Sequence, residues 1–321
     1  MKLLRQRDFG LLAGAVGVSA LGDWLALTPL ALYLQRSTGS GLIVAGLFVA
    51  IWSPSIVFAP LAGLLVDRLE TRRLLGIVSL AQAGVAVGLS FAHASGPVLA
   101  LAALLGTGFA LAQPAEFALV PAVAGSARLT EANGLVETSR YLGFVLGPLA
   151  GGLLSAAGGF QAAMLANAVT FVAVAAASAV IRVDRPGHFE SGAARSERAR
   201  DGLAVLFRDR VLGLVMVVAF ASLLFMTASA PAEVFFAKQT LNAGDFGFGV
   251  LLAGWTIGMA LGALVLARRV RTALALAALT AIVVQSVGLA LPTLWLVFAF
   301  ALVSWWVGAS RTDSRTCSYG H

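Results

Sequence analysis

Residues 63–73 read Gly63-Leu64-Leu65-Val66-Asp67-Arg68-Leu69-Glu70-Thr71-Arg72-Arg73. This short charged stretch separates two apolar runs, roughly residues 42–66 and 74–92, and each run is long enough to cross a hydrocarbon layer of about 30 Å as a helix. The stretch contains several arginines, and short loops rich in Lys and Arg stay on the cytoplasmic side of a membrane. It therefore predicts a cytoplasmic loop between two transmembrane helices.

The same alternation of apolar runs and short loops continues along the chain. If successive loops lie on alternate sides of the membrane, twenty of the twenty-two Lys and Arg residues fall on the same side as the N-terminus. Only Arg36 and Lys238 fall on the other side. This bias predicts an all-α polytopic membrane protein with both termini in the cytoplasm. About ten transmembrane helices are expected, at roughly 9–34, 42–66, 74–92, 98–120, 135–157, 161–181, 211–236, 247–267, 272–291 and 293–310.

The composition agrees with a membrane protein and excludes several other classes. Hydrophobic residues make up 59% of the chain and charged residues 12%, which is too apolar for the surface of a soluble domain. The net charge of +7 belongs to the cytoplasmic loops, so the lipid bilayer is an expected partner and nucleic acid is not. One cysteine, and histidines confined to loops and the tail, predict neither a metal site nor a cofactor. Arginine far outnumbers lysine, which is typical of a GC-rich bacterial genome and indicates a bacterial inner-membrane protein.

The chain divides into two apolar blocks joined by a polar segment. Residues 1–183 are expected to form a six-helix bundle, 184–210 a cytoplasmic linker, 211–310 a bundle of four helices, and 311–321 a polar tail. Transporters built from two repeats have this layout, and here the second repeat contains two helices fewer than the first. The abrupt loss of apolar periodicity after Trp306 favours a frameshift or truncation, with a natural terminus as the alternative.

The loop at 63–73 resembles a motif of the major facilitator superfamily, Gly-x-x-x-Asp-Arg-x-Gly-basic-basic. Glu70 stands where the motif has glycine, and Thr71 stands where it has a basic residue. The resemblance implies a gating role, and ordinary cytoplasmic anchoring is the alternative. The residues that match the motif are Gly63, Asp67, Arg68, Arg72 and Arg73.

The fifth predicted span contains a second motif, Gly143-Phe144-Val145-Leu146-Gly147-Pro148-Leu149-Ala150-Gly151-Gly152. It is similar to the Gly-x-x-x-Gly-Pro-x-x-Gly-Gly motif of exporters in the superfamily. Small residues four apart allow close helix contact, and the eighth span has the same spacing at Gly254, Gly258 and Gly262. In the superfamily, helices 5 and 8 face each other between the two halves, so the two stripes are expected to meet. The alternative is that each stripe packs within its own half.

Further stretches resemble the branch that includes the enterobactin and macrolide exporters. They are Leu21-Gly22-Asp23-Trp24, Gln113-Pro114-Ala115 with Leu119-Val120-Pro121, and Glu131-Ala132-Asn133-Gly134. The resemblance implies a two-bundle secondary active transporter, an efflux permease for drug-like or siderophore-like small molecules that works by alternating access. A truncated, non-transporting membrane protein or scaffold remnant is the alternative. An enzyme is not expected, because the spans lack a Ser/His pair, a His-Glu-x-x-His motif and a Gly-x-Ser-x-Gly motif.

Asp23 is the most informative single residue, because it lies near the middle of the first span. A carboxylate at that depth costs a few kcal/mol at least unless it is protonated, paired or in contact with water. Asp23, Trp24 and Gln113 are therefore the candidate cavity and coupling residues, with a proton or another ion as the coupling partner and a structural carboxyl group as the alternative. The charged residues near the cytoplasmic ends of spans 4 and 5 are interpreted first as an interfacial cluster and second as a gate: Glu116, Glu137 and Arg140.

Overall fold

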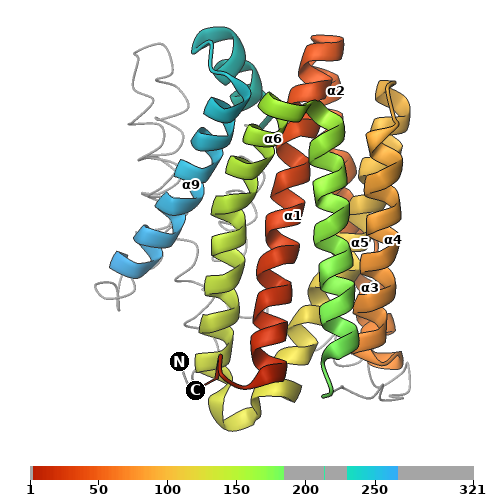
Figure 1. Cartoon of the computed structure of the whole chain (residues 1–321), viewed down its shortest axis with the longest axis vertical. Coiled ribbons are helices and arrows are strands. Elements are labelled where there is room, and N and C mark those ends of the chain that lie inside the picture. Colours follow the sequence, from red (N-terminus) through yellow and green to blue (C-terminus); the bar gives the residue numbers. More distant parts are fainter. Residues whose placement is uncertain (1–2, 184–212, 214–229, 267–321) are drawn as a thin grey trace. The chain divides into compact units, whose positions relative to one another are not determined.

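A computed structural model of the chain describes residues 3–183, 213 and 230–266 (Figure 1). In these ranges the chain is helical and contains no strand, which confirms the predicted all-α fold. The predicted linker, most of span 7, spans 9 and 10 and the polar tail lie outside the described residues. The described elements are α1 (Arg7–Thr38), α2 (Gly41–Val57), α3 (Ala59–Arg68), α4 (Thr71–Ser90), α5 (Ser95–Ala124), η1 (Ser126–Arg128), α6 (Leu129–Val180), η2 (Phe236–Thr240) and α9 (Asp245–Leu266).

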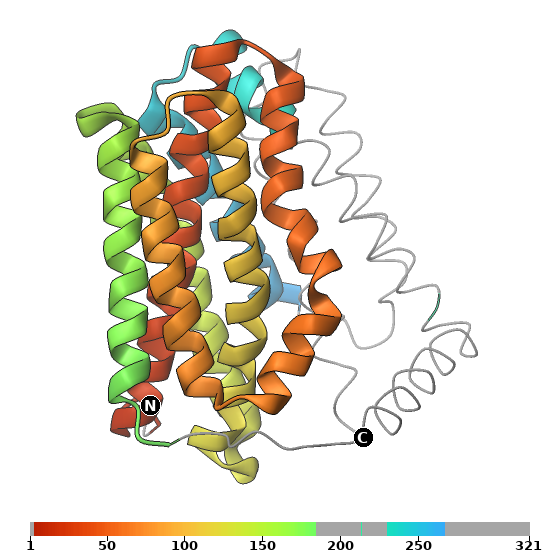
Figure 2. The same cartoon turned by 90° about the vertical axis from the view of Figure 1, so that its right-hand side faces the viewer.

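The helices that precede residue 183 have the length and apolarity of membrane spans. Within the described part, α1, α4, α5 and α6 each qualify alone, and α2 with α3 forms one more span that is bent by 55° (Figure 2). Helix α6 is 52 residues long and consists of two helices joined at Gly159, where φ is 73° and ψ is −174°. Glycine is the residue that adopts this backbone conformation without steric cost. With α6 counted as two candidate spans, residues 3–183 contain six, the number expected from the sequence.

The chain forms two compact units. One unit comprises Met1–Phe189 and Ala230–Val250, and the other comprises Glu190–Ser229 and Leu251–His321. The sequence assigns residues 230–250 to the second bundle, whereas in the structure this segment packs with the first. In the first unit α1 lies between the two arms of α6 (Figure 1). Its buried apolar side chains, among them Phe9, Leu12 and Val16, form a common core with residues of α4, α5 and α6.

The glycine stripe of α6 brings its backbone against that of α1. A Cβ atom at Gly143 would lie 2.4 Å from the carbonyl oxygen of Gly17, and one at Gly147 would lie 2.7 Å from that of Leu21. The contact continues at Gly151, where a Cβ would lie 2.6 Å from the carbonyl oxygen of Leu25. Side chains at these three positions would force α6 and α1 apart. The glycine stripe therefore allows the close helix packing that small residues four apart permit.

This packing corrects the expectation that Gly143, Gly147 and Gly151 face span 8. The neighbouring face of α6 makes the contact with the start of α9 instead. A Cβ at Gly249 would lie 2.3 Å from the carbonyl oxygen of Pro148, and one at Gly152 would lie 2.6 Å from that of Asp245. The motif therefore serves two partners, because Pro148 and Gly152 follow the stripe positions by one residue and point about 100° away around the helix. Of the span 8 stripe, Gly254 belongs to the second unit, and the surroundings of Gly258 and Gly262 lie outside the described residues.

Candidate functional site

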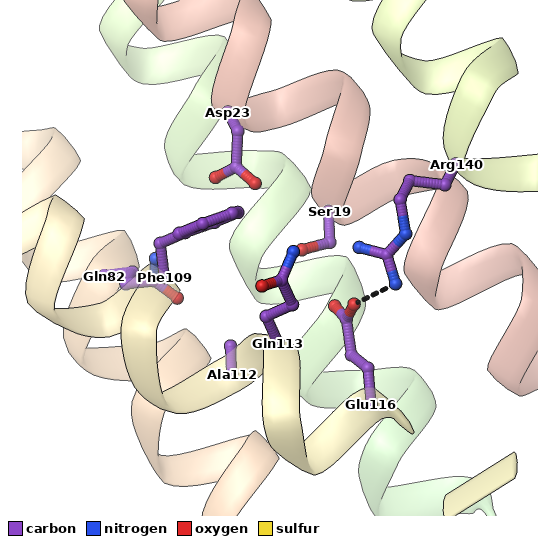
Figure 3. Close-up of a pocket in the computed structure, with 8 residues that line it drawn as sticks. All are labelled: Ser19, Asp23, Gln82, Phe109, Ala112, Gln113, Glu116 and Arg140. Atoms are coloured by element: carbon purple, nitrogen blue, oxygen red, sulfur yellow. Dashed lines mark ion pairs between the residues drawn. The ribbon is translucent and has the colours of Figure 1, made fainter. Parts of the chain in front are cut away.

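A small polar pocket lies inside the first unit, among α1, α4, α5 and α6 (Figure 3). Its volume is about 10 Å³, roughly the space of one water molecule. Two of its residues are four apart on α1, and those from α5 follow the spacing of one helix face. The lining residues are Ser19, Asp23, Gln82, Phe109, Ala112, Gln113, Glu116 and Arg140.

Arg140 and Glu116 form a buried ion pair at one end of this pocket. Arg140 Nη2 lies 3.3 Å from Glu116 Oε2, and their side chains are 7% and 2% exposed. Arg140 Nε lies 3.5 Å from Glu137 Oε1, and Glu137 is partly exposed. The guanidinium also lies over the ring of Phe117, 4.8 Å from its centroid. Two members of the expected interfacial cluster are therefore buried, and only Glu137 has the exposure that the interpretation predicts.

The pocket has spare hydrogen-bonding capacity on both partners of the pair. Among the described residues, Glu116 Oε1 is buried without a hydrogen-bond partner, and Arg140 Nε and Nη2 are buried with only the ion-pair contacts of 3.5 and 3.3 Å. Buried polar atoms in folded proteins normally have one, so these atoms mark a place suited to a small polar ligand or to proton exchange. With Asp23, the pocket contains two carboxyl groups and one guanidinium.

The structure brings Asp23 and Gln113 together, but it does not place Trp24 in the pocket. Asp23 lies midway along α1 and points toward the pocket from the side opposite Gln113 (Figure 3). Trp24 packs edge-on against Phe144 of α6, with ring centroids 5.8 Å apart. Phe144 in turn makes an edge contact with Tyr141.

Gln82 is a pocket residue that the sequence analysis did not single out. It is buried, and its Nε2 donates to the carbonyl oxygen of Leu105 over 3.4 Å. A Cβ at Gly108 would lie 2.4 Å from Gln82 Cγ, so this glycine provides the space that the glutamine occupies. An amide within an otherwise apolar span was the available signal, as was a hydroxyl at Ser19 one turn before Asp23.

The loop at 63–73 contacts the cytoplasmic end of α6. Arg72 Nη1 donates to the carbonyl oxygen of Ile181 over 2.5 Å. Asp8, in the first turn of α1, accepts the backbone N–H groups of Arg182 and Val183, both over 3.1 Å. Thr71 is fully buried at the start of α4, which explains why a basic residue is not accommodated at that position. Other motif residues lie nearer the surface: Gly63 and Asp67 are partly exposed, and Arg68 and Arg73 are exposed.

Comparison with known proteins gives one family and a set of distant relatives. The family model described as the Major Facilitator Superfamily matches residues 12–312. Proteins named "Putative bacilysin exporter BacE" from Bacillus amyloliquefaciens and Bacillus subtilis are each 29% identical over 176 residues, which covers 54% of this chain and 43% of theirs. The chain thus spans less than half the length of these curated relatives.

Several solved structures have the same fold. A bacterial homolog to the human lysosomal transporter Spinster, in an inward-facing and unoccupied conformation, matches with a TM-score of 0.73 and 15% identity, over 97% of this chain and 74% of that one. The nucleoside transporter NupG matches with a TM-score of 0.75 and 11% identity, over 94% and 79%. A D-xylose-proton symporter matches with a TM-score of 0.64 and 15% identity, over 95% and 80%. At these identities the likeness establishes the fold alone.

Proposed function

The chain belongs to the Major Facilitator Superfamily, and on that premise we propose that it is a secondary transporter of the membrane that exports small molecules in exchange for protons that bind the pocket around Asp23. The pocket and the span 5 motif support this proposal. The motif is similar to that of the superfamily's exporters, and the curated relatives bear the name of an exporter. A drug-like or siderophore-like molecule remains the proposed class of substrate.

The observation that carries the proton step is the charge balance of the pocket. Asp23 and Glu116 are two acids, and Arg140 is the only base among the eight residues that line the pocket. If all three were ionised, the pocket would carry one negative charge in excess. An uncompensated charge at this depth costs at least a few kcal/mol, so one carboxyl group binds a proton. The carboxyl group releases that proton on the other side of the membrane as the substrate moves in the opposite direction. This exchange couples the movement of the proton to that of the substrate.

In this proposal, Arg140 alternates between two arrangements, one beside each carboxyl group of the pocket. Its Nη2 lies 3.3 Å from Glu116 Oε2 and its Nε lies 3.5 Å from Glu137 Oε1, and both distances are longer than an ordinary hydrogen bond. A guanidinium held by such long contacts can move toward whichever carboxyl group is ionised. The proton therefore resides on the carboxyl group that Arg140 leaves. Gln113, on the same face of α5 as Glu116, provides an uncharged polar group beside both.

The test is proton-coupled transport in inverted membrane vesicles that contain the full chain. Respiration acidifies the vesicles, a fluorescent amine reports the internal pH, and the added probes are ethidium, erythromycin and bacilysin. The intact chain is expected to release protons with at least one probe. Asp23→Asn and Glu116→Gln are each expected to reduce that release at least tenfold.

Glu131→Gln is the matched control, because Glu131 is an exposed carboxylate whose ion pair with Arg128 lies outside the pocket. It should release protons as the intact chain does. Undiminished release from Asp23→Asn would make that carboxyl group structural and refute the proton step. Release from none of the variants or the intact chain with any probe would favour a non-transporting membrane protein.

A further inference from the structure

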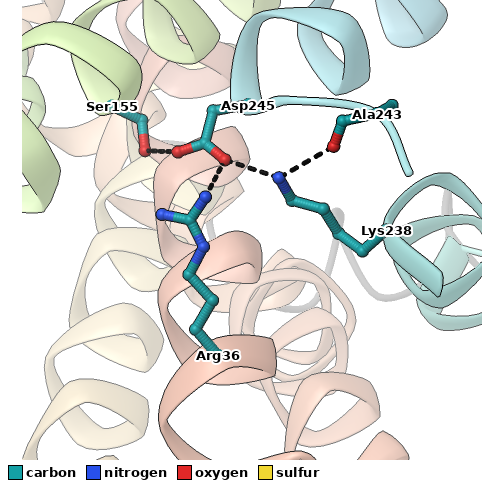
Figure 4. Close-up of polar contacts among 5 residues, drawn as sticks. All are labelled: Arg36, Ser155, Lys238, Ala243 and Asp245. Carbon is teal, nitrogen blue, oxygen red and sulfur yellow. Dashed lines mark hydrogen bonds and ion pairs between the residues drawn. The ribbon is translucent and has the colours of Figure 1, made fainter.

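Four side chains from four different elements meet at the outer end of the first unit (Figure 4). Asp245, the first residue of α9, is at the centre, and its side chain is 2% exposed. It accepts a hydrogen bond from Arg36 near the end of α1, another from Lys238 Nζ over 2.7 Å, and a third from Ser155 Oγ of α6 over 2.7 Å. Lys238 also donates to the carbonyl oxygen of Ala243 over 3.0 Å, which fixes its position in η2.

The carboxyl group of Asp245 is held in its ionised form. Burial alone would raise its pKa, but the hydrogen bonds from Lys238 and Ser155 and the charges of Arg36 and Lys238 together lower the pKa below its ordinary value of 3.8. Asp245 therefore remains an anion at physiological pH, and it binds both cations at once.

The charge pattern of the sequence makes this meeting point unusual. Arg36 and Lys238 are the two basic residues that the predicted topology places on the outer side, against twenty on the cytoplasmic side. Basic residues in outer loops oppose the bias that orients a membrane protein. Both outer cations bind the same carboxylate, although Arg36 and Asp245 are 209 positions apart in the chain. The two outer basic residues therefore meet at a single carboxylate.

We propose that Arg36, Lys238 and Asp245 form a latch that closes the outer side of the transporter by fastening α1 and α6 to the start of α9. The backbone contacts next to the latch support a closed arrangement. At Gly152 a Cβ atom would lie 2.6 Å from the carbonyl oxygen of Asp245, so α6 and the start of α9 touch without intervening side chains. A substrate passing outward between these elements must first separate them, and the latch opposes that separation.

The latch can also open. The side chain of Arg36 is 55% exposed, so water solvates this cation when the pair separates, and half-exposed ion pairs are weak. Asp245 loses three donors at once, but as the first residue of α9 its carboxylate stays at the positive end of the helix dipole. Its negative charge therefore remains partly stabilised when the latch opens. This inference rests on the proposed alternating access, and it adds the residues that hold one end state.

The experiment uses a cross-link close to the latch that involves none of its residues. A Cβ at Gly41 of α2 would lie 3.8 Å from the ring of Phe235, just before η2. In a Cys317→Ser background, the full chain with Gly41→Cys and Phe235→Cys is treated in membranes with a short thiol cross-linker. The intact latch should give a high yield, and Asp245→Asn should lower the yield at least threefold.

Three further variants separate a latch from a general folding defect. Asp245→Glu retains the charge and should retain most of the cross-link. Arg36→Gln and Lys238→Gln each remove one of the two cations, so each should give a yield between those of the intact chain and Asp245→Asn. If Asp245→Asn fails to insert, the two single-cation variants decide the question by the same readout.

Arg128→Gln is the matched control, since it removes a cation from an exposed ion pair with Glu131 on the cytoplasmic side and should leave the yield unchanged. Equal cross-linking in the intact chain, in Arg36→Gln and in Lys238→Gln would overturn the proposal, and so would an equal loss in Arg128→Gln. The readout needs no substrate and no proton gradient. Failure of the latch is thus distinguishable from failure of proton-coupled export.

Discussion

Replacing Gly143 by alanine tests the direct backbone contact between α1 and α6. The new Cβ would lie 2.4 Å from the carbonyl oxygen of Gly17 and 2.7 Å from the backbone nitrogen of Leu21, whereas ordinary contacts are 3.4–4 Å. Neither neighbour is a flexible side chain, so the two helices must separate by roughly 1 Å. Overpacking of this kind costs about 1–3 kcal/mol. Alanine also favours a helix interior over glycine by about 0.5–1 kcal/mol, which offsets part of the cost.

Gly134→Ala isolates the packing cost, because Gly134 lies in the same helix with no atom within 4 Å of its Cβ position. Both variants share the gain in helix propensity, so their difference should be about 1–3 kcal/mol. For a domain of this size that corresponds to a difference in Tm of about 2–12 °C. The assay is thermal unfolding in detergent, followed by the monodisperse fraction that survives heating. Equal Tm values for the two variants would refute the contact between Gly143 and α1 and would mean that the glycine stripe packs against another helix.

Two other predictions concern the charged groups. Arg140→Met should lower the free energy of unfolding by about 3–5 kcal/mol, because it leaves the buried Glu116 carboxylate uncompensated, and adding Glu116→Gln should restore most of the loss; an equal loss in the double variant would contradict the pairing. The lowered pKa of Asp245 means that its contribution to stability is full above the pKa of an unfolded aspartate, about 3.9, and is lost as the pH falls through the lower folded value. The Tm difference between the intact chain and Asp245→Asn should therefore be constant from about pH 8 to pH 5 and shrink below about pH 4; a difference that disappears between pH 7 and pH 5 would contradict the assignment.

The membrane fold could be predicted from the sequence because span length and loop charge are physical requirements of the bilayer. The importance of Asp23 could be predicted for a similar reason, since an acid within an apolar run is costly wherever the helices pack. Its connection to Arg140 could not, because distance along the chain does not reveal how far a long side chain reaches into the bundle. Arg140 lies close to the cytoplasmic end of its span in the sequence, yet its side chain extends inward to Glu116.

The glycine motif shows a second limit of the sequence. Small residues four apart predict a flat helix face, but a flat face has no chemical group that identifies its partner. Gly147 lies against the backbone of α1, but the absence of a side chain does not specify that helix as its partner. Similarly, the sequence shows the two outer basic residues but does not predict the latch. A carboxylate in a loop does not indicate which cations it will bind.

The long separation between Arg36 and Asp245 has a consequence for how the protein is made. Arg36 is synthesised 209 residues before Asp245, which at about 5–20 residues per second is roughly 10–40 s earlier. During that interval the first six spans enter the bilayer with Arg36 in water on the outer side and its carboxylate partner still untranslated. The outer contact therefore forms only after the start of α9 has crossed the membrane. A ribosome that stalls before Asp245 leaves a bundle that lacks this outer contact.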